Sequence, residues 1–422
     1  MFKKEILSNG ITVVAEQIPH VKSVSLGLWI KVGSRDEELK EHGISHFIEH
    51  MFFKGTEKRS AKEIAQEMDS LGGELNAFTS REATCFYLKV LDEDLLDAVK
   101  LLSDIFHNST FDRREIGKEK QVVIEEINMV ADDPEDYLHD LHVKNMLKDN
   151  PLGRPILGNV ETVRSMDRRK ILDFIGRHYQ PKDIVIAVAG NFELVYLMKT
   201  LDRYFGRYSA KDTDGKIRIT PEIDVDTLIK RKKLEQVHIC IGMRGLPLPH
   251  KDRYALYLLN SIVGGSLSSR LFHEIRERRG LAYSIYSYLS LYYDAGQFNI
   301  YAATSVNSAE EVIRLIKREL SSIRRGGIGA DEMRKTKNQL KGNLMLSMES
   351  TGTRMNKLAK DEIYFGQFFS LEDMISEIES VSKDQIRILA EEIFDPTGFS
   401  VTILGPLSKK DIGGVILSYS RG

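Results

Sequence analysis

Hydrophobic and polar positions alternate in some stretches of the chain and recur with helical spacing in others. The stretch "SVSLGLWIKVGS" at 23–34 alternates apolar with small or polar residues, which is typical of a half-buried strand. Ser60, followed three residues later by Glu63, forms the capping-box pattern that begins a helix. "ELNAFTSREATCFYLKVL" at 74–91 predicts further strand, and the residues at 112–134 predict a long helix that ends near a proline.

The same order of patterns returns in the second half of the chain. "VHICIGMRGL" at 237–246 matches the strand pattern at 23–34, and "SAEEVIRLIKRELSSI" at 308–323 matches the helical pattern at 92–106. This repetition at a very long period indicates an internal duplication. Because strands and helices mix without strict alternation, the predicted fold class is α+β. We expect two similar domains, each with helices packed on a mostly antiparallel sheet.

The length of the chain also favours two domains, because 422 residues exceed what one typical core holds. The pattern weakens between about residues 205 and 230, where "RYSAKDTDGKIRITPEID" is rich in polar and turn-forming residues. We therefore predict an N-terminal domain at 1–210, a linker region at 211–230 and a homologous C-terminal domain at 231–422.

Composition narrows the class of protein. Hydrophobic residues make up 42% of the chain and charged residues 29%, which is typical of a soluble globular protein. The net charge of -2 gives no reason to expect nucleic acid or an anionic membrane as a partner. No apolar run approaches the ~18 residues that span a membrane, and no apolar leader is visible. Cys85 and Cys240 make no disulfide framework, so the cytoplasm is the expected location.

The densest polar cluster lies in "HGISHFIEH" at 42–50. If this stretch is helical, His46 and His50 lie on one face about 40° apart, as two imidazoles that chelate zinc would. Glu49 is poorly placed as a third ligand from the same turn, but it could take a proton from a water on the metal. His42, followed by a glycine, is expected outside the ligand set. The H-x-x-E-H order is known from zinc enzymes but needs a third ligand elsewhere.

The helix predicted at 112–134 offers candidates for that ligand. Helical spacing assigns its buried face to Ile116, Val123, Ile127 and Val130. Glu125 points almost opposite and is expected in solvent. Glu119 and Glu126 lie seven residues apart on one half-buried stripe, where carboxylates are costly unless they pair or bind a cation. We therefore predict Glu126 as the third ligand and Glu119 as an auxiliary carboxylate, with an ion pair to a basic residue as the alternative.

Together these residues resemble a known family. "HFIEHMFFKGT" with a glutamate 76 residues after His50, "PLGRPILG" at 151–158 and "RLFHEIRERRGLAYS" at 270–284 resemble the M16 zinc metallopeptidases, also called inverzincins. The resemblance covers essentially the whole chain and is strongest to the processing-peptidase branch, which includes the β subunit of mitochondrial processing peptidase. It implies a zinc endopeptidase with one Zn²⁺ per chain that acts on extended or unfolded peptides.

The resemblance also implies residue roles. His46, His50 and Glu126 would bind zinc, Glu49 would be the general base, and Glu119 would assist. The second half lacks a copy of the metal motif, because a shift of 217 residues pairs Glu126 with Asn343.

Substrate-binding residues follow from the same resemblance. Arg276 and Tyr283 match a pair that binds the substrate backbone or the reacting carbonyl. Asn76 and Ala77 match an edge strand that pairs with extended substrates.

The resemblance finally bears on partners. The chain keeps both the metal motif and the Arg/Tyr pair, as the bacterial members that act as homodimers do. We therefore expect peptide substrates and a homodimer, with no nucleic acid and no membrane. Two alternatives remain open: a noncatalytic structural subunit, like the core proteins of the respiratory bc1 complex, and a catalytic subunit that requires an inactive partner chain.

Overall fold

The computed structural model describes residues 1–210, 218–408 and 410–411. Its strands are β1 (Phe2–Ile6), β2 (Thr12–Gln17), β3 (Ser23–Ile30), β4 (Glu74–Thr79), β5 (Thr84–Leu91), β6 (Ile184–Gly190), β7 (Thr227–Arg231), β8 (Val237–Gly245), β9 (Ala282–Leu291), β10 (Gly296–Thr304) and β11 (Ser400–Gly405). Its α-helices are α1 (Ile44–Phe52), α2 (Ala61–Ser70), α3 (Leu95–Asn108), α4 (Arg113–Asp132), α5 (Pro134–Leu147), α6 (Val160–Arg164), α7 (Arg168–His178), α8 (Leu194–Phe205), α9 (Arg253–Val263), α10 (Ala309–Gly326), α11 (Ala330–Ser347), α12 (Thr351–Phe365), α13 (Leu371–Ser380) and α14 (Lys383–Ile393).

Two sheets share a five-strand order. The first has the order β1-β2-β6-β3-β5-β4 and the second has the order β7-β11-β8-β10-β9, so the first repeats the second with β1 added antiparallel to β2. In each sheet one pair is parallel, β2 with β6 and β7 with β11, and the following pairs are antiparallel. The predicted α+β class, with two similar and mostly antiparallel sheets, is therefore confirmed.

The chain forms two compact units that each include a segment from the other half of the sequence. The first unit comprises residues 1–129, 154–218 and 347–368, and the second comprises 130–153, 219–346 and 369–422. Helix α5 thus belongs to the second unit and helix α12 to the first. The division predicted from the sequence was contiguous, and residues 211–217 of its predicted linker lie outside the described part of the chain. Local patterns do not reveal which sheet a helix covers.

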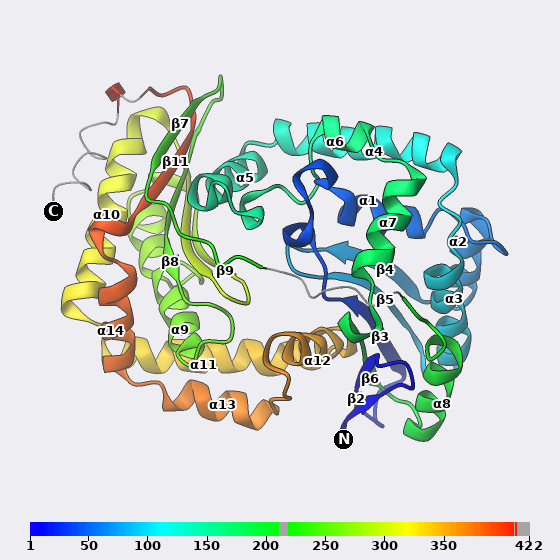
Figure 1. Ribbon diagram of the computed structural model, residues 1–422. Helices are drawn as coiled ribbons and strands as arrows, with labels where there is room; N and C mark the ends of the chain where they lie inside the picture. The colour runs from blue at the N-terminus through cyan, green and yellow to red at the C-terminus, as the bar shows by residue number, and fades with distance from the viewer. Residues whose placement is uncertain (211–217, 409, 412–422) are drawn as a thin grey trace. The chain divides into compact units, whose positions relative to one another are not determined.

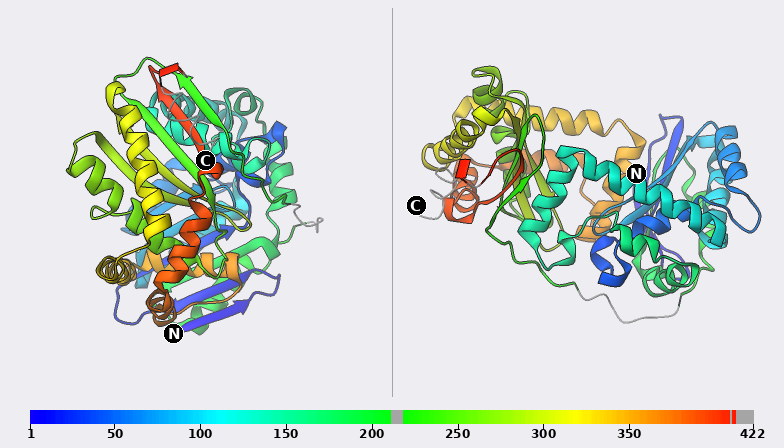
Figure 2. Two further views of the ribbon diagram at one scale, coloured as in Figure 1. Left: turned by 90° about the vertical axis from the view of Figure 1, so that its left-hand side faces the viewer. Right: turned by 90° about the horizontal axis from the view of Figure 1, so that it is seen from above.

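In the first unit, α12 covers one face of the sheet by packing on β6, β3 and β2. Gly27 in β3 permits this close approach, because a Cβ there would lie 2.5 Å from the Met355 sulfur of α12. The Trp29 indole also donates to that sulfur at 3.4 Å. The opposite face carries the larger apolar core, to which α1, α3 and α7 contribute (Figures 1 and 2).

The second unit repeats this arrangement with α5, which packs on β11 and β8. Gly242 in β8 again lacks room for a side chain: a Cβ would lie 2.2 Å from the Met146 sulfur and 2.4 Å from His142 Nε2 of α5. Helices α9, α10 and α14 cover the opposite face and form its apolar core (Figure 1). No helix in the described part of the chain is long and apolar enough to cross a membrane.

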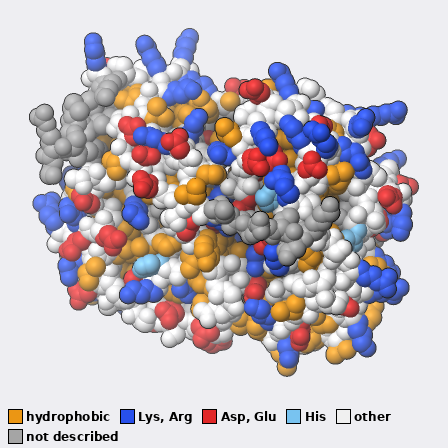
Figure 3. Space-filling model, in the orientation of Figure 1, with side chains coloured by type: hydrophobic (Ala, Val, Ile, Leu, Met, Phe, Trp, Pro, Cys, Tyr) orange, Lys and Arg blue, Asp and Glu red, His pale blue; other side chains and the backbone are white. Residues whose placement is uncertain are grey.

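Charged side chains are spread over the surface. Figure 3 shows Lys and Arg interspersed with Asp and Glu on the face that it presents. Neither the positive nor the negative side chains form a continuous patch on that face, in keeping with the net charge of -2.

Candidate metal centre

Helix α1 begins at a glycine that packs against a second glycine. Gly43 is its N-cap with φ 91°, and a Cβ at this position would lie 2.7 Å from the Gly158 Cα. Gly158 itself has φ 80°, so both residues need the left-handed conformation that glycine adopts freely. This contact fixes the start of α1 against the loop that ends "PLGRPILG". His42 also bonds to this loop, with Nε2 2.7 Å from the Pro155 carbonyl oxygen, and it is not part of the group formed by His46, His50 and Glu126.

A buried carboxylate caps the same helix. Glu37 is 3% exposed and accepts hydrogen bonds from the backbone N–H groups of Gly43 at 2.7 Å and Ser45 at 2.9 Å. Burial raises the pKa of Glu37 to about 8, against the opposing effect of these two bonds. Glu37 was not predicted as part of the site, because its only signal in the sequence is an acid shortly before a predicted helix start.

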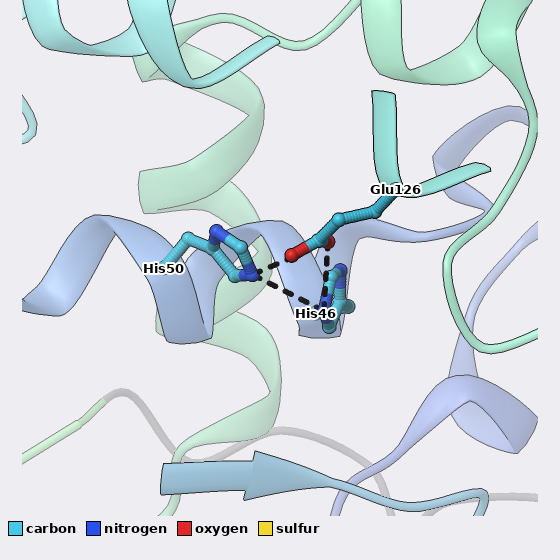
Figure 4. A group of neighbouring side chains, drawn as sticks. All are labelled: His46, His50 and Glu126. Atoms are coloured by element: carbon cyan, nitrogen blue, oxygen red, sulfur yellow. Dashed lines mark hydrogen bonds and ion pairs between the residues drawn. The ribbon is translucent and has the colours of Figure 1, made fainter. Parts of the chain in front are cut away.

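Three side chains of the first unit converge on one point. His46 Nε2 and His50 Nε2 lie 3.2 Å apart, and Glu126 Oε2 lies 3.7 Å from the first nitrogen and 3.6 Å from the second. Figure 4 shows both imidazoles on α1 and the carboxylate reaching toward them from α4. Zinc–nitrogen bonds of about 2.0–2.1 Å in a tetrahedron place ligand atoms about 3.3 Å apart. The observed spacing fits such a metal.

Unpaired polar atoms strengthen that fit. Glu126 Oε2 is buried and has no hydrogen-bond partner among the described residues, and neither has His46 Nδ1. An unpaired buried carboxylate oxygen is costly, and a cation between it and the two imidazoles would remove the cost. Burial, with a smaller effect from His50, lowers the pKa of His46 to about 4, so this imidazole is neutral, as a ligand must be.

The long helix α4 places its glutamates much as the periodicity predicted. Glu125 is exposed and Glu126 is partly buried, whereas Glu119 is 3% exposed and so more deeply buried than expected. Ile116 and Val123 are buried as predicted. Ile127 and Val130, assigned to the same face, are only partly buried.

Glu119 orients one of the two imidazoles. Its Oε1 lies 2.7 Å from His50 Nδ1, and its Oε2 lies 2.6 Å from Lys54 Nζ. Burial alone would raise the pKa of Glu119, but the bonds from His50 and Lys54 outweigh burial and lower it. Burial likewise would lower the pKa of His50, yet Glu119 and Glu126 raise it. Lys54, in the "FKGT" that follows α1, was not predicted as part of this group.

Glu49 lies on α1 beside the strand β4. The Thr79 hydroxyl donates to Glu49 Oε2 at 2.6 Å and so restrains its carboxylate. Burial raises the pKa of Glu49, although the bond from Thr79 opposes that rise. A carboxylate with a raised pKa is a better proton acceptor at neutral pH.

Strand β4 carries Asn76 and Ala77 at the end of the first sheet. It pairs with β5 through Asn76 opposite Tyr87 and Ala77 opposite Phe86, and it is the terminal strand of the described sheet. A pocket of about 510 Å³ lies beside it. Its lining includes Phe53, Ile64, Met68, Leu75 and Tyr87.

Arg276 and Tyr283 lie together in the second unit. The Arg276 guanidinium carbon is 5.7 Å from the centre of the Tyr283 ring and 4.9 Å from that of Phe272. Tyr283 is 77% exposed, so its hydroxyl is open to solvent. The candidate metal ligands belong to the first unit, so the structure brings together two groups of predicted residues, one in each unit.

Comparison with known proteins supplies a family. The family model for insulinase (peptidase family M16) matches residues 12–160, and the model for the peptidase M16 inactive domain matches residues 165–340. The uncharacterized zinc protease YmxG of Bacillus subtilis is 42% identical over 406 residues, which are 96% of this chain and 98% of that protein. An uncharacterized zinc protease of Streptomyces coelicolor is 37% identical over 415 residues, covering 97% of this chain and 90% of that protein.

Solved structures show the same fold. A protease from Helicobacter pylori matches with a TM-score of 0.91 at 23% identity, covering 96% of this chain and 99% of that one. A chain of complex III from Candida albicans matches with a TM-score of 0.84 at 20% identity, covering 98% and 99%. At these identities the likeness establishes the fold alone.

Proposed function

Because the chain belongs to peptidase family M16, we propose that it is a zinc-dependent endopeptidase that cleaves extended or unfolded peptides with one Zn²⁺ per chain. One observation carries the proposal: the buried Glu126 Oε2, which has no hydrogen-bond partner among the described residues, lies within 3.7 Å of the Nε2 atoms of both His46 and His50. These three residues would hold the metal. When bound, zinc would polarise the scissile carbonyl and lower the pKa of a water molecule.

Glu49 would then act as the general base. It would take a proton from the water that attacks the scissile carbonyl carbon and deliver it to the nitrogen of the departing amine. The Thr79 hydroxyl, 2.6 Å from Glu49, would keep the carboxylate in one orientation during both transfers. Glu119 would assist by orienting His50 through Nδ1 at 2.7 Å.

Substrate binding would use the terminal strand β4. An extended peptide could pair with the backbone at Asn76 and Ala77. Because such pairing uses main-chain hydrogen bonds, it tolerates peptides of diverse sequence. The pocket beside β4 could accept a side chain of such a peptide. Arg276 and Tyr283 would donate hydrogen bonds to the substrate backbone or the reacting carbonyl oxygen.

The assembly that we propose is a homodimer in the cytoplasm, related to the processing peptidases and without a different partner chain. A noncatalytic structural subunit is the alternative, and the similarity to a chain of complex III at 20% identity favours it only at the level of fold. Such a subunit has no need for His46, His50 and Glu126 to converge.

Metal analysis and a peptide assay on the size-exclusion peak test this proposal. We expect one zinc per chain, cleavage of unfolded peptides and loss of cleavage with a chelator. A dimer that holds zinc but cleaves only after a second chain is added would instead support the subunit that requires a partner. Absence of stoichiometric zinc would support the noncatalytic subunit.

A further inference from the structure

The segment that carries Arg276 is not an ordinary helix. Residues Phe272–Glu277 form a π-helix, a rare geometry that is frequent at functional sites. Its defining bond runs from the Arg278 N–H to the His273 carbonyl oxygen at 2.9 Å, five residues back. With the extra residue in this turn, a side chain comes near the residue five positions on, which an α-helix would place about 140° away. A specific interaction must therefore hold the segment against return to the α-helical register.

Glu274 supplies such an interaction. It is 9% exposed and binds three guanidinium groups at once. Arg279, five residues on, donates to Oε1 from Nη2 at 2.9 Å and from Nε at 3.1 Å, and Arg278 donates to Oε2 at 3.1 Å. Arg318 of α10 also donates to Oε1. The pair at i and i+5 suits the π-helical spacing, and Arg318 ties the segment to a core helix.

Arg276, between these residues, takes no part in the cluster. Its contacts are with the faces of the Phe272 and Tyr283 rings, and it has no ion pair among the described residues. The Tyr283 hydroxyl likewise has no hydrogen-bond partner in the described part of the chain. Glu274, the carboxylate two residues away, is already occupied by three other cations. Arg276 and Tyr283 therefore keep their donors available.

We propose that Glu274 is a positioning residue that holds the π-helical turn through Arg278, Arg279 and Arg318, and so keeps Arg276 and Tyr283 side by side and unpaired. The inference rests on the proposed role of Arg276 and Tyr283 in binding the peptide. Loss of the π-helical register would turn the following residues by about 100°, the rotation of one helical position. Arg278 and Arg279 begin the loop that leads into β9, so the same cluster sets the start of the strand that carries Tyr283.

The test compares Glu274→Gln with Glu274→Asp in the full-length chain. We expect Glu274→Gln to raise KM for an unfolded peptide about tenfold, with a smaller change in kcat, and Glu274→Asp to recover part of the loss. Zinc content should stay at the parental value. Arg314→Met is the matched control for Arg318→Met, because Arg314 lies on α10 but, among the described residues, pairs only with Glu310 and Glu311. Its kinetics should be parental.

A double-mutant cycle with Arg276→Met separates positioning from general stability. If Glu274 acts through Arg276, Glu274→Gln will cause little further loss in the Arg276→Met background. An equal loss in both backgrounds would overturn the inference, as would parental KM for Glu274→Gln beside an impaired Arg276→Met. Parental kinetics of Arg276→Met would overturn the proposed role of Arg276 and this inference with it. If Glu274→Gln fails to fold, Arg318→Met replaces it. This variant removes a single partner of Glu274, so it should raise KM for the unfolded peptide by a smaller factor.

Discussion

His50 Nδ1 lies 2.7 Å from Glu119 Oε1, so a buried carboxylate of α4 orients an imidazole of α1. This contact fixes the Nδ1–H of His50 toward α4 and leaves Nε2 for the group formed with His46 and Glu126. Lys54 Nζ holds the other oxygen of Glu119 at 2.6 Å. The ligand geometry therefore depends on a chain of contacts that begins just beyond the end of α1.

Replacing Lys54 tests this chain of contacts. Lys54→Met would leave Glu119 buried without its cationic partner, so the carboxylate would hold His50 less firmly. Changes of this kind beside metal ligands typically weaken metal affinity by about 10- to 100-fold. Chelator competition should show that loss for Lys54→Met and a smaller one for Lys54→Arg. Equal affinity in Lys54→Met and the parental chain would show that Glu119 needs no cation.

Glu49 should be separable from metal binding. Glu49→Gln keeps the size of the side chain and the contact with Thr79 but cannot accept a proton. We expect parental zinc content and a loss of cleavage of at least about 100-fold, the usual range for a general base. Thr79→Val should show a milder loss with zinc retained. Cleavage by Glu49→Gln at the parental rate would exclude the mechanism.

The docking of α5 should depend on pH. Burial lowers the pKa of His142 to about 3, and its two nitrogens lie 2.9 Å from the Thr402 hydroxyl and 3.3 Å from the Asn299 amide oxygen. Below pH 6.5 the unfolded chain takes up a proton on this histidine that the folded chain does not. The contribution of the neutral His142 to the free energy of unfolding is therefore complete above that pH. It falls by about 1.4 kcal/mol per pH unit as the pH drops toward 3.

Hydrogen exchange of the 134–147 segment measures this effect. Between pH 6.5 and 5 the free energy of opening should fall by about 2 kcal/mol from His142. The partly buried His139, whose pKa is also lowered by burial, adds in the same direction. In His142→Gln the pH dependence should be smaller by that amount. If the free energy of opening in His142→Gln depends on pH as in the parental chain, a group other than His142 causes the effect.

Gly242 should be intolerant of a side chain. A Cβ there would lie 2.2 Å from the Met146 sulfur and 2.4 Å from His142 Nε2, so Gly242→Ala must displace these buried side chains of α5 and should destabilise the second unit by about 1–3 kcal/mol. Gly176 in α7 is the control, because its Cβ would meet nothing within 4 Å. Gly176→Ala should stabilise its helix by up to about 1 kcal/mol. Thermal unfolding of both variants checks the contrast, and equal effects would contradict the close packing of α5.

Sequence periodicity predicted the parts of this structure that depend on local spacing. It placed Glu125 in solvent and Glu126 at a partly buried position because both follow from the 3.6-residue turn of one helix. It could not find Glu37 or Lys54. The partners of Glu37 lie at the start of α1, and Lys54 meets Glu119 only when α1 packs beside α4. It also missed the exchange of α5 and α12 between units, because an amphipathic pattern shows that a helix has a buried face but not which sheet covers it.

The adjacent glutamates of α4 offer the most direct test of the proposed metal centre. Zinc stoichiometry and affinity should be measured for the parental chain, Glu126→Gln and Glu125→Gln. We predict one zinc per chain in the parental protein and in Glu125→Gln, and a loss of at least tenfold in affinity for Glu126→Gln. A parental protein without stoichiometric zinc, or equal affinities in the two variants, would contradict the assignment of His46, His50 and Glu126 as the metal ligands.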